Sequence, residues 1–333
     1  MRALIYQETG LVLDTNYPQP RPIEGEALIR VLQVGICNTD LEILRGYMDF
    51  QGILGHEFVG IVEEIYGHQA QQRYAHLKGQ RVVGEINAAC HRPDCPACQN
   101  NMPTHCSNRT TLGIVNRNGA FADYLTLPLE NLHLVPENVS NEEAVFVEPL
   151  AANFEILEQV HLKPTDHVII LGDGKMGQLA AQVLALTGCE VTMLGKHEEK
   201  LALAAPHGVS TRLLSDIAET QSIPHASRVD LVVECTGSPQ GLELAMRLVR
   251  PRGTIILKST VADRSSLYLA PTVIDEIRVQ GSRCGPFPPA LRALSTHRVD
   301  VRPLISARYP LNDGLTAFQH AEQKGVLKVL VQI

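Results

Sequence analysis

The stretch that decides the fold is DHVIILGDGKMGQLAAQVLALTG, residues 166–188. It begins with a short apolar run typical of a buried strand, passes through a glycine-rich turn and ends as an apolar-periodic helix. Gly172, Gly174 and Gly177 have the G-x-G-x-x-G spacing. Such a triplet is weak evidence alone, but here it has the preceding strand and following helix that a dinucleotide site requires.

Each glycine of this motif has a separate physical role. The first makes the tight turn, the second lets the backbone approach a pyrophosphate, and the third lets helix and strand pack closely. The pyrophosphate would then lie at the helix N-terminus, where unpaired N–H groups and the helix dipole favour negative charge. We therefore predict that Gly172, Gly174 and Gly177 bind a dinucleotide; a tight turn without a ligand is the alternative.

The end of the second strand indicates which dinucleotide. NAD sites usually have an Asp or Glu there, which holds the ribose hydroxyls. This chain has Gly195 followed by Lys196. A glycine leaves room for a 2'-phosphate and a lysine can pair with it, so NADP is favoured over NAD. In the alternative, Lys196 is a solvated cation and Glu198 serves the ribose.

The rest of the chain shows two patterns of predicted secondary structure. Further β-type runs, VDLVVECTG (229–237) and GTIILKST (253–260), alternate with helical stretches. This alternation predicts an α/β domain with a doubly wound parallel sheet over residues 151–275. Residues 1–150 instead contain short β-type runs separated by Gly, Pro and Asn, which predicts a β-rich domain. The tail, 276–333, is predicted to return to it with a turn, a helix and a closing strand.

The segment between the two predicted domains has sequence features that indicate a helix. Ser140 and Glu143 have the spacing of a capping box, which predicts a helix start. The apolar-periodic helix that follows is predicted to be interrupted at Pro149.

The length, charge and hydropathy of the chain argue against several classes of protein. A chain of 333 residues is long for one core and suggests two domains. Its net charge of −7 and lack of a basic stripe argue against nucleic acid. No apolar run approaches the ~20 residues of a membrane span. The N-terminus lacks a signal peptide's cleavage site, so we expect a cytoplasmic protein, in which stable disulfides are disfavoured.

Four of the eight cysteines lie in CHRPDCPACQNNMPTHC, residues 90–106. Since disulfides are disfavoured, the residues alone leave metal binding or redox chemistry open.

Three more segments complete a pattern: GICNTDLEI (35–43), LGHEFVG (54–60) and FVEPLAA (146–152). With the cysteine lobe and the glycine loop, in this order, the chain resembles the zinc-containing medium-chain dehydrogenase/reductase family over nearly its whole length. The resemblance implies a GroES-like catalytic domain, a Rossmann dinucleotide domain, and hydride transfer between an alcohol and a nicotinamide cofactor.

The resemblance also implies a catalytic zinc. Cys37 and His56 match the family's ligands, Glu148 matches the position of a third ligand, and Glu57 matches the glutamate beside the histidine. Thiolate, imidazole and carboxylate all suit zinc, which would act as a Lewis acid. Which carboxylate binds the metal, Glu57 or Glu148, stays open.

Residues after Cys37 match a proton relay. In an extended segment Thr39 would share a face with Cys37, so its hydroxyl could reach the reacting oxygen. Asp40 matches the carboxylate that orients a ligand histidine. Members of the family often have a histidine where this chain has Glu42, which could accept a proton, contact a substrate hydroxyl or face solvent.

The resemblance assigns the lobe to a structural zinc with the four thiolates Cys90, Cys95, Cys98 and Cys106, a closed site that does no chemistry. Four residues separate Cys90 from Cys95, where the family usually has two. A redox pair in CPAC is the alternative, and His91 is interpreted as a bystander. The remaining thiols are interpreted as core residues: Cys189, Cys235 and Cys284.

We therefore expect a zinc-dependent alcohol or polyol dehydrogenase with two zinc ions per chain and NADP as the favoured cofactor. DEIRVQGSRCG (275–285) resembles the family's strand that pairs across subunits, which implies a homodimer or homotetramer. A sugar dehydrogenase is one alternative, because Glu42 offers a carboxylate to a polyhydroxylated substrate. A nucleotide-binding regulatory protein without turnover is the alternative from another class.

Overall fold

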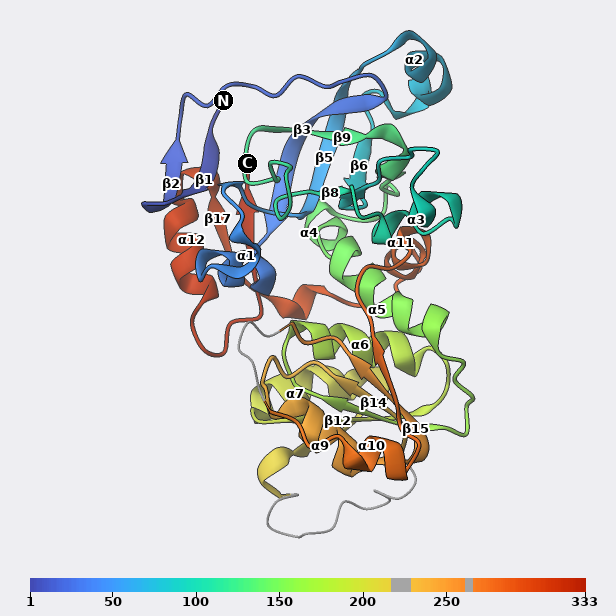
Figure 1. The fold of residues 1–333 in the computed structure, drawn as a ribbon. Coiled ribbons are helices and arrows are strands. Elements are labelled where there is room, and N and C mark those ends of the chain that lie inside the picture. Colours follow the sequence, from blue (N-terminus) through green and yellow to red (C-terminus); the bar gives the residue numbers. More distant parts are fainter. Residues whose placement is uncertain (217–228, 261–265) are drawn as a thin grey trace. The chain divides into compact units, whose positions relative to one another are not determined.

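The computed structural model describes residues 1–216, 229–260 and 266–333. The chain forms two compact units (Figure 1). Unit 1 consists of Met1–Glu148 and Leu291–Ile333, and unit 2 of Pro149–Ala290. Among the helices of the described residues, none is both long enough and apolar enough to cross a membrane.

Unit 2 is built on a parallel sheet of six strands in the order β13-β12-β11-β14-β15-β16. This is the predicted doubly wound arrangement. Its strands are β11 (His167–Leu171), β12 (Glu190–Gly195), β13 (Ser210–Leu213), β14 (Val229–Glu234), β15 (Val249–Leu257) and β16 (Arg278–Gly281). Its helices are α5 (Val147–Gln159), α6 (Lys175–Ala185), α7 (Glu198–Ala204), α9 (Gly241–Leu248) and α10 (Ala270–Ile274), with α11 (Phe287–Ser295) leading back to unit 1.

The sheet of unit 2 is buried on both faces, which explains its apolar strands. Successive side chains of a strand point to opposite faces. Val168 and Ile170 of β11 accordingly pack in one core with α6 and α7, whereas Ile169 and Leu171 pack in the other with α9.

Unit 1 is β-rich, as predicted. Its main sheet has the order β10-β6-β5-β3-β18-β17, with β9 also paired to β3. The main-sheet strands are β3 (Glu26–Gly35), β5 (Glu57–Ile65), β6 (Arg81–Gly84), β9 (Tyr124–Pro128), β10 (Leu132–Leu134), β17 (Ile305–Pro310) and β18 (Lys328–Gln332). The small strands are β1 (Ala3–Gln7), β2 (Gly10–Asp14), β4 (Gly52–Ile53), β7 (Asn87–Ala88) and β8 (Thr110–Thr111). The helices are α1 (Asn38–Leu44), α2 (His68–Tyr74), α3 (Pro96–Gln99), α4 (Asn141–Ala144) and α12 (Gly314–Ala321).

Strand β3 is the centre of unit 1, and its register positions the site. Its last residue, Gly35, lies opposite Glu57 on β5 and opposite Leu330 on β18. Three segments distant in sequence are thereby brought side by side, including the closing strand predicted for the tail.

Two predicted boundaries were wrong. The chain returns to unit 1 at Leu291 and not at residue 276, because β16 pairs in parallel with β15 and so belongs to the unit 2 sheet. The helix that follows Ser140 breaks at residues 145–146 and not at Pro149. Pro149 lies in the first turn of α5, where its missing N–H has no partner to lose.

The glycine loop allows a matched test of packing. A Cβ at Gly177 would lie 2.0 Å from the carbonyl oxygen of Gly172, whereas a Cβ at Gly174 would meet nothing within 4 Å. We expect Gly177→Ala to lower the free energy of unfolding by about 1–3 kcal/mol, because helix and strand must separate. Gly174→Ala, at φ −73°, should cost less than about 1 kcal/mol. Equal urea-unfolding midpoints for the two variants would contradict this account.

Candidate active site and metal centres

Cys37, His56 and Glu57 each offer one ligand atom, and these atoms lie within 4.8 Å of one another. Cys37 follows β3 and caps the start of α1, and Glu57 begins β5. Because β3 and β5 are antiparallel, the end of one meets the start of the other. The sheet register therefore assembles the cluster.

Asp40 holds the two ligand segments together. Its side chain is fully buried. One oxygen, Oδ2, accepts the backbone N–H of Cys37 at 2.8 Å, and Oδ1 accepts the N–H of Gly55 at 3.1 Å. The same Oδ1 lies 3.4 Å from Nδ1 of His56. Asp40 thus has the place expected of a carboxylate that orients a ligand histidine.

The segment after Cys37 is helical, so the expectation of an extended segment was wrong. Asp40 reaches back to the N–H of Cys37 as in a capping box, and this bond starts α1 at Asn38. The Thr39 hydroxyl nevertheless lies 3.7 Å from the Cys37 sulfur. The two side chains are close because of the helix cap and not because of strand alternation.

The donor set fits a zinc ion. Glu57 Oε1 is a buried atom without a hydrogen-bond partner, and leaving such an atom unsatisfied is costly. His56 Nδ1 faces Asp40, so Nε2 is the ring atom left for a metal. Burial lowers the pKa of His56, but the negative Asp40 and Cys37 raise it by more, so it lies well above its ordinary value. The pocket therefore attracts positive charge. Zinc would supply that charge in place of a proton, because it requires the neutral imidazole.

Glu148 and Glu42 are placed differently from Glu57. Glu148 is half-buried in the first turn of α5 and is not a member of the Cys37 cluster. Glu42 lies on α1 and accepts a hydrogen bond from Arg45 at 2.8 Å. Arg45 caps the C-terminus of α1, so the structure pairs Glu42 with a charged residue at the end of the same helix. The three roles that the sequence left open for Glu42 stay predictions.

Sequence reasoning missed Lys328. Its ammonium donates to Glu57 Oε2, both side chains are buried, and it also lies 5.6 Å from the centre of the Phe146 ring. A Cβ at Gly35 would lie 2.6 Å from that same Glu57 oxygen, so the glycine makes room for the pair. The signal was a lone lysine opening the apolar strand KVLVQ, since a buried lysine needs a partner.

We expect Lys328→Met to lower the free energy of unfolding by about 3–5 kcal/mol, because it leaves Glu57 charged and unpaired in the interior. Arg308→Met on the neighbouring β17 is the matched control. It removes an exposed pair with Glu142 and should cost at most about 1 kcal/mol. Adding Glu57→Gln to Lys328→Met should recover part of the loss in thermal or urea unfolding. A double variant no more stable than the single one would contradict the ion-pair account.

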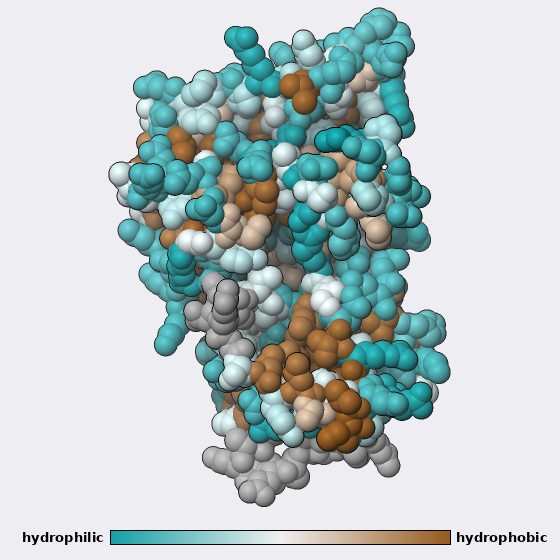
Figure 2. All heavy atoms as spheres, viewed as in Figure 1, coloured by the Kyte–Doolittle hydropathy of each residue, from teal (hydrophilic) through white to brown (hydrophobic). Residues whose placement is uncertain are grey.

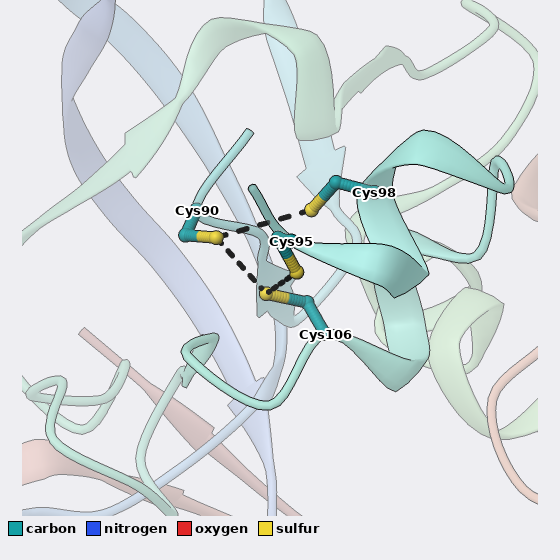
Figure 3. A group of neighbouring side chains, drawn as sticks. All are labelled: Cys90, Cys95, Cys98 and Cys106. Atoms are coloured by element: carbon teal, nitrogen blue, oxygen red, sulfur yellow. Dashed lines mark hydrogen bonds between the residues drawn. The ribbon is translucent and has the colours of Figure 1, made fainter. Parts of the chain in front are cut away.

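The four cysteines of the lobe point toward one another (Figure 3). Sulfur–sulfur distances are 3.9 Å for Cys90–Cys98, 3.7 Å for Cys95–Cys106 and 3.4 Å for Cys106–Cys90. All four are free thiols. Four converging sulfurs are the donor set of a closed tetrahedral zinc site.

The thiols of the lobe differ in acidity. Burial, together with Cys95 and Cys106, raises the pKa of Cys98 to about 12. Burial also raises the pKa of Cys106, but hydrogen bonds from the backbone and thiol of Cys90 outweigh it, and the pKa falls to about 6. One thiolate shared among neighbouring thiols is therefore favoured before any metal binds.

The wide interval between Cys90 and Cys95 closes as a turn. The N–H of Cys95 donates to the Arg92 carbonyl at 3.1 Å, and Arg92 pairs with Asp94. His91 pairs with Glu130 and lies outside the thiol cluster.

Of the other cysteines, Cys189 lies in the unit 2 core and Cys235 packs against that core. Cys284 is half-buried and is a member of neither described core of unit 2. The core interpretation therefore fits two of the three.

The glycine loop has the expected backbone. Gly172 has φ 118°, and a Cβ there would lie 2.7 Å from the Cys235 carbonyl oxygen. Only glycine tolerates both constraints. Gly174 caps α6 beside open space, and Gly177 packs against Gly172. Contact with a dinucleotide stays a prediction.

Gly195 has a neighbour that the sequence did not reveal. A Cβ at this position would lie 2.6 Å from both Cβ and Oδ2 of Asp173, the second residue of the glycine loop. The space beside Gly195 is thus filled by Asp173, which corrects the expectation that it stands open for a phosphate. The Lys196 side chain is exposed and has no ion-pair partner within the described part of the chain.

Comparisons with known proteins agree with this geometry. Residues 23–137 match the family described as alcohol dehydrogenase GroES-like domain, and residues 176–296 match the one described as zinc-binding dehydrogenase. An erythritol/L-threitol dehydrogenase of Mycolicibacterium smegmatis is 30% identical over 323 residues, 89% of this chain and 86% of the relative. The chain belongs to the zinc-containing medium-chain dehydrogenase/reductase family. The predicted family, fold and enzyme class are confirmed: it is a dehydrogenase that depends on zinc and a nicotinamide cofactor.

Other relatives match this dehydrogenase over its full length. A sorbitol dehydrogenase of Halalkalibacterium halodurans is 27% identical over 346 residues, 99% of both chains. The solved structure of a zinc-binding dehydrogenase from Sinorhizobium meliloti 1021, bound to NADP, is 27% identical with a TM-score of 0.88, covering 100% of this chain and 99% of that one. An alcohol dehydrogenase from Thermus sp. ATN1 has the same identity and TM-score, with 100% of both chains covered.

Proposed function

We propose that this dehydrogenase oxidises a polyol or another alcohol by hydride transfer to NADP, with a zinc ion held by Cys37, His56 and Glu57. The observation that carries the proposal is the cluster of three donors, two of them buried, in which Glu57 Oε1 has no hydrogen-bond partner. The names of the relatives, sorbitol dehydrogenase and erythritol/L-threitol dehydrogenase, support a sugar alcohol as substrate. Glu148 stays the alternative third ligand.

The chain's own residues have separate parts in this proposal. Zinc supplies Lewis acidity, which lowers the pKa of an alcohol and polarises a carbonyl in the reverse direction. Asp40 lies against the ring of His56, and Lys328 holds Glu57 in place through their ion pair. The Thr39 hydroxyl, beside Cys37, relays the proton of the substrate: it accepts that proton and gives up its own to solvent.

The proposed preference for NADP rests on Lys196. Its exposed ammonium follows β12 at the carboxyl edge of the parallel sheet, where ligands of such sheets bind. The Asp173 carboxylate lies beside Gly195, but its Oδ2 accepts hydrogen bonds from the backbone N–H groups of Lys196 and His197.

The two alternatives are less well supported. Glu42, which suggested a sugar substrate, has its carboxylate bonded to Arg45. A regulatory protein without turnover would have no use for the Cys37 cluster. Alcohols, polyols, sugars and aldehydes assayed with both NADP(H) and NAD(H) would identify the substrate class.

Two zinc ions per chain are proposed, and two variants separate them. His56→Ala should abolish oxidation and leave NADPH binding intact, because the residue lies outside the dinucleotide unit. Cys98→Ser should release a different zinc and lower stability, because a structural metal is coupled to folding. The measurements are zinc per chain by mass spectrometry, turnover and NADPH affinity. His56→Ala with a tenth of the parent turnover, or Cys98→Ser with the parent's zinc content, would contradict the respective assignment.

We also propose that two copies of the chain associate through the free edge of β16. This strand ends the unit 2 sheet, and each of its residues is exposed. Apolar surface gathers over the part of unit 2 that includes α10 (Figure 2). Exposed apolar side chains here are Tyr268, Leu269, Val273, Ile274 and Val279. An unpaired strand edge and an apolar patch together mark an interface.

We expect Val279→Lys combined with Ile274→Lys to shift the protein from a dimer or tetramer toward smaller species in light scattering, because two charges would be buried at the interface. Ile23→Lys, on an exposed apolar residue of unit 1, is the matched control and should leave the mass unchanged. An unaltered mass in the double variant would place the interface elsewhere.

A further inference from the structure

An acidic side chain lies within the predicted cofactor site. Asp173, in the glycine loop, is only 7% exposed. Its Oδ2 accepts three hydrogen bonds, from the backbone N–H of Lys196 at 2.6 Å, the backbone N–H of His197 at 2.8 Å and the ring Nδ1 of His197 at 3.0 Å. Burial raises the pKa of Asp173, but the hydrogen bonds from His197 and Lys196 outweigh it and hold the pKa below its ordinary value. Asp173 is therefore an anion at neutral pH.

The carboxylate ties two segments of unit 2 together. Asp173 follows β11, and its acceptor atom binds the turn between β12 and α7. Gln178 of α6 supports the same arrangement, because its amide donates to the backbone carbonyls of Asp173 and Lys200 at 3.3 and 2.8 Å. Gly195 leaves the space that Asp173 fills. The turn after β12 is thus fixed to the glycine loop.

This arrangement decides which groups the turn presents. Because Nδ1 of His197 donates to Asp173, Nε2 is the ring atom left for a ligand. The His197 side chain is 41% exposed, and within the described residues its Nε2 has no partner. Lys196 beside it is exposed, and its ammonium also has no ion-pair partner among the described residues. With Nδ1 donating to Asp173, Nε2 is a donor when the ring carries both protons. The imidazolium form of His197 and the Lys196 ammonium together therefore complement a ligand group that is an acceptor with negative charge.

We propose that His197, held by Asp173, binds the 2'-phosphate of NADP through Nε2, and that this pair together with Lys196 sets the cofactor preference. The proposal rests on the proposed dehydrogenase function. His197 contacts the phosphate, and Asp173 is a positioning residue that acts through the imidazole. The competing outcome is that Oδ1 of Asp173, or Glu198 in the first turn of α7, accepts a ribose hydroxyl of NAD.

The test is the dissociation constant of NADPH and of NADH, measured by fluorescence titration of the zinc-loaded enzyme. We expect His197→Gln to weaken NADPH by about tenfold to a hundredfold, the range of one charge-assisted hydrogen bond, and to change NADH by less than about twofold on the same scale. His161→Gln is the matched control. It changes an exposed histidine that precedes β11, at the opposite edge of the sheet from the glycine loop.

Competition by 2',5'-ADP and 5'-AMP isolates the phosphate from the nicotinamide and the zinc. His197→Gln should weaken 2',5'-ADP and spare 5'-AMP. Asp173→Asn should also lower the preference for NADPH, but it should add no further loss in the His197→Gln background, because it acts through that ring. A role confined to stability would lower the affinity for both cofactors in either background.

The outcomes separate the inference from the function on which it rests. If the parent binds neither cofactor, the proposed function is wrong. If the parent prefers NADH, or if His197→Gln weakens both cofactors alike, the phosphate site is wrong while the dehydrogenase function stands. Melting temperatures of each variant show whether it is folded.

Discussion

The buried ion pair between Glu57 and Lys328 is the constraint on which unit 1 depends. Taking two opposite charges out of water costs several kcal/mol for each ion, so neither residue can be buried without the other. Their pairing requires β18 beside β3, with β5 on the other side of β3. The same register places Cys37 next to His56. The same strand register is therefore required both to neutralise the buried charge of Glu57 and to bring the candidate metal ligands together.

Both units use a carboxylate in the same way. Asp40 accepts backbone N–H groups from two segments and lies against Nδ1 of His56. Asp173 accepts backbone N–H groups from the turn after β12 and bonds Nδ1 of His197. In each case an aspartate fixes a turn and leaves Nε2 of an imidazole for a ligand. In our two proposals the first ligand is a cation and the second an anion, and histidine can serve both because its protonation is variable.

The sequence predicted what local patterns determine. The strand, glycine turn and helix at 166–188 specified the parallel unit, and the resemblance to the family implied the cluster of four cysteines. Lys328 could not be found in this way, because its partner Glu57 is 271 residues away and only the sheet register brings them together. Asp173 occupies a variable position of the glycine motif, so the pattern said nothing of its direction.

The remaining errors have physical causes too. The cap formed by Asp40 at Cys37 turns the chain into a helix where side-chain alternation suggested an extended segment. Strand β16 has four residues that are all exposed, so it carries no apolar period, and the boundary of unit 2 was placed too early. Hydrogen bonds of single side chains and exposed edge strands produce no hydrophobic period in the sequence, whereas buried faces of strands and helices do.

Unit 2 is inserted within unit 1, because residues 149–290 separate the two parts of unit 1. During synthesis Glu57 therefore emerges long before the strand that carries its counter-ion. Until Lys328 is present, closing the sheet around Glu57 would bury an uncompensated charge, which disfavours closure before β18 is synthesised. Unit 2 is continuous in sequence and has no such delay. All the strands of unit 2 are therefore synthesised before β18, the strand that completes the ion pair of unit 1.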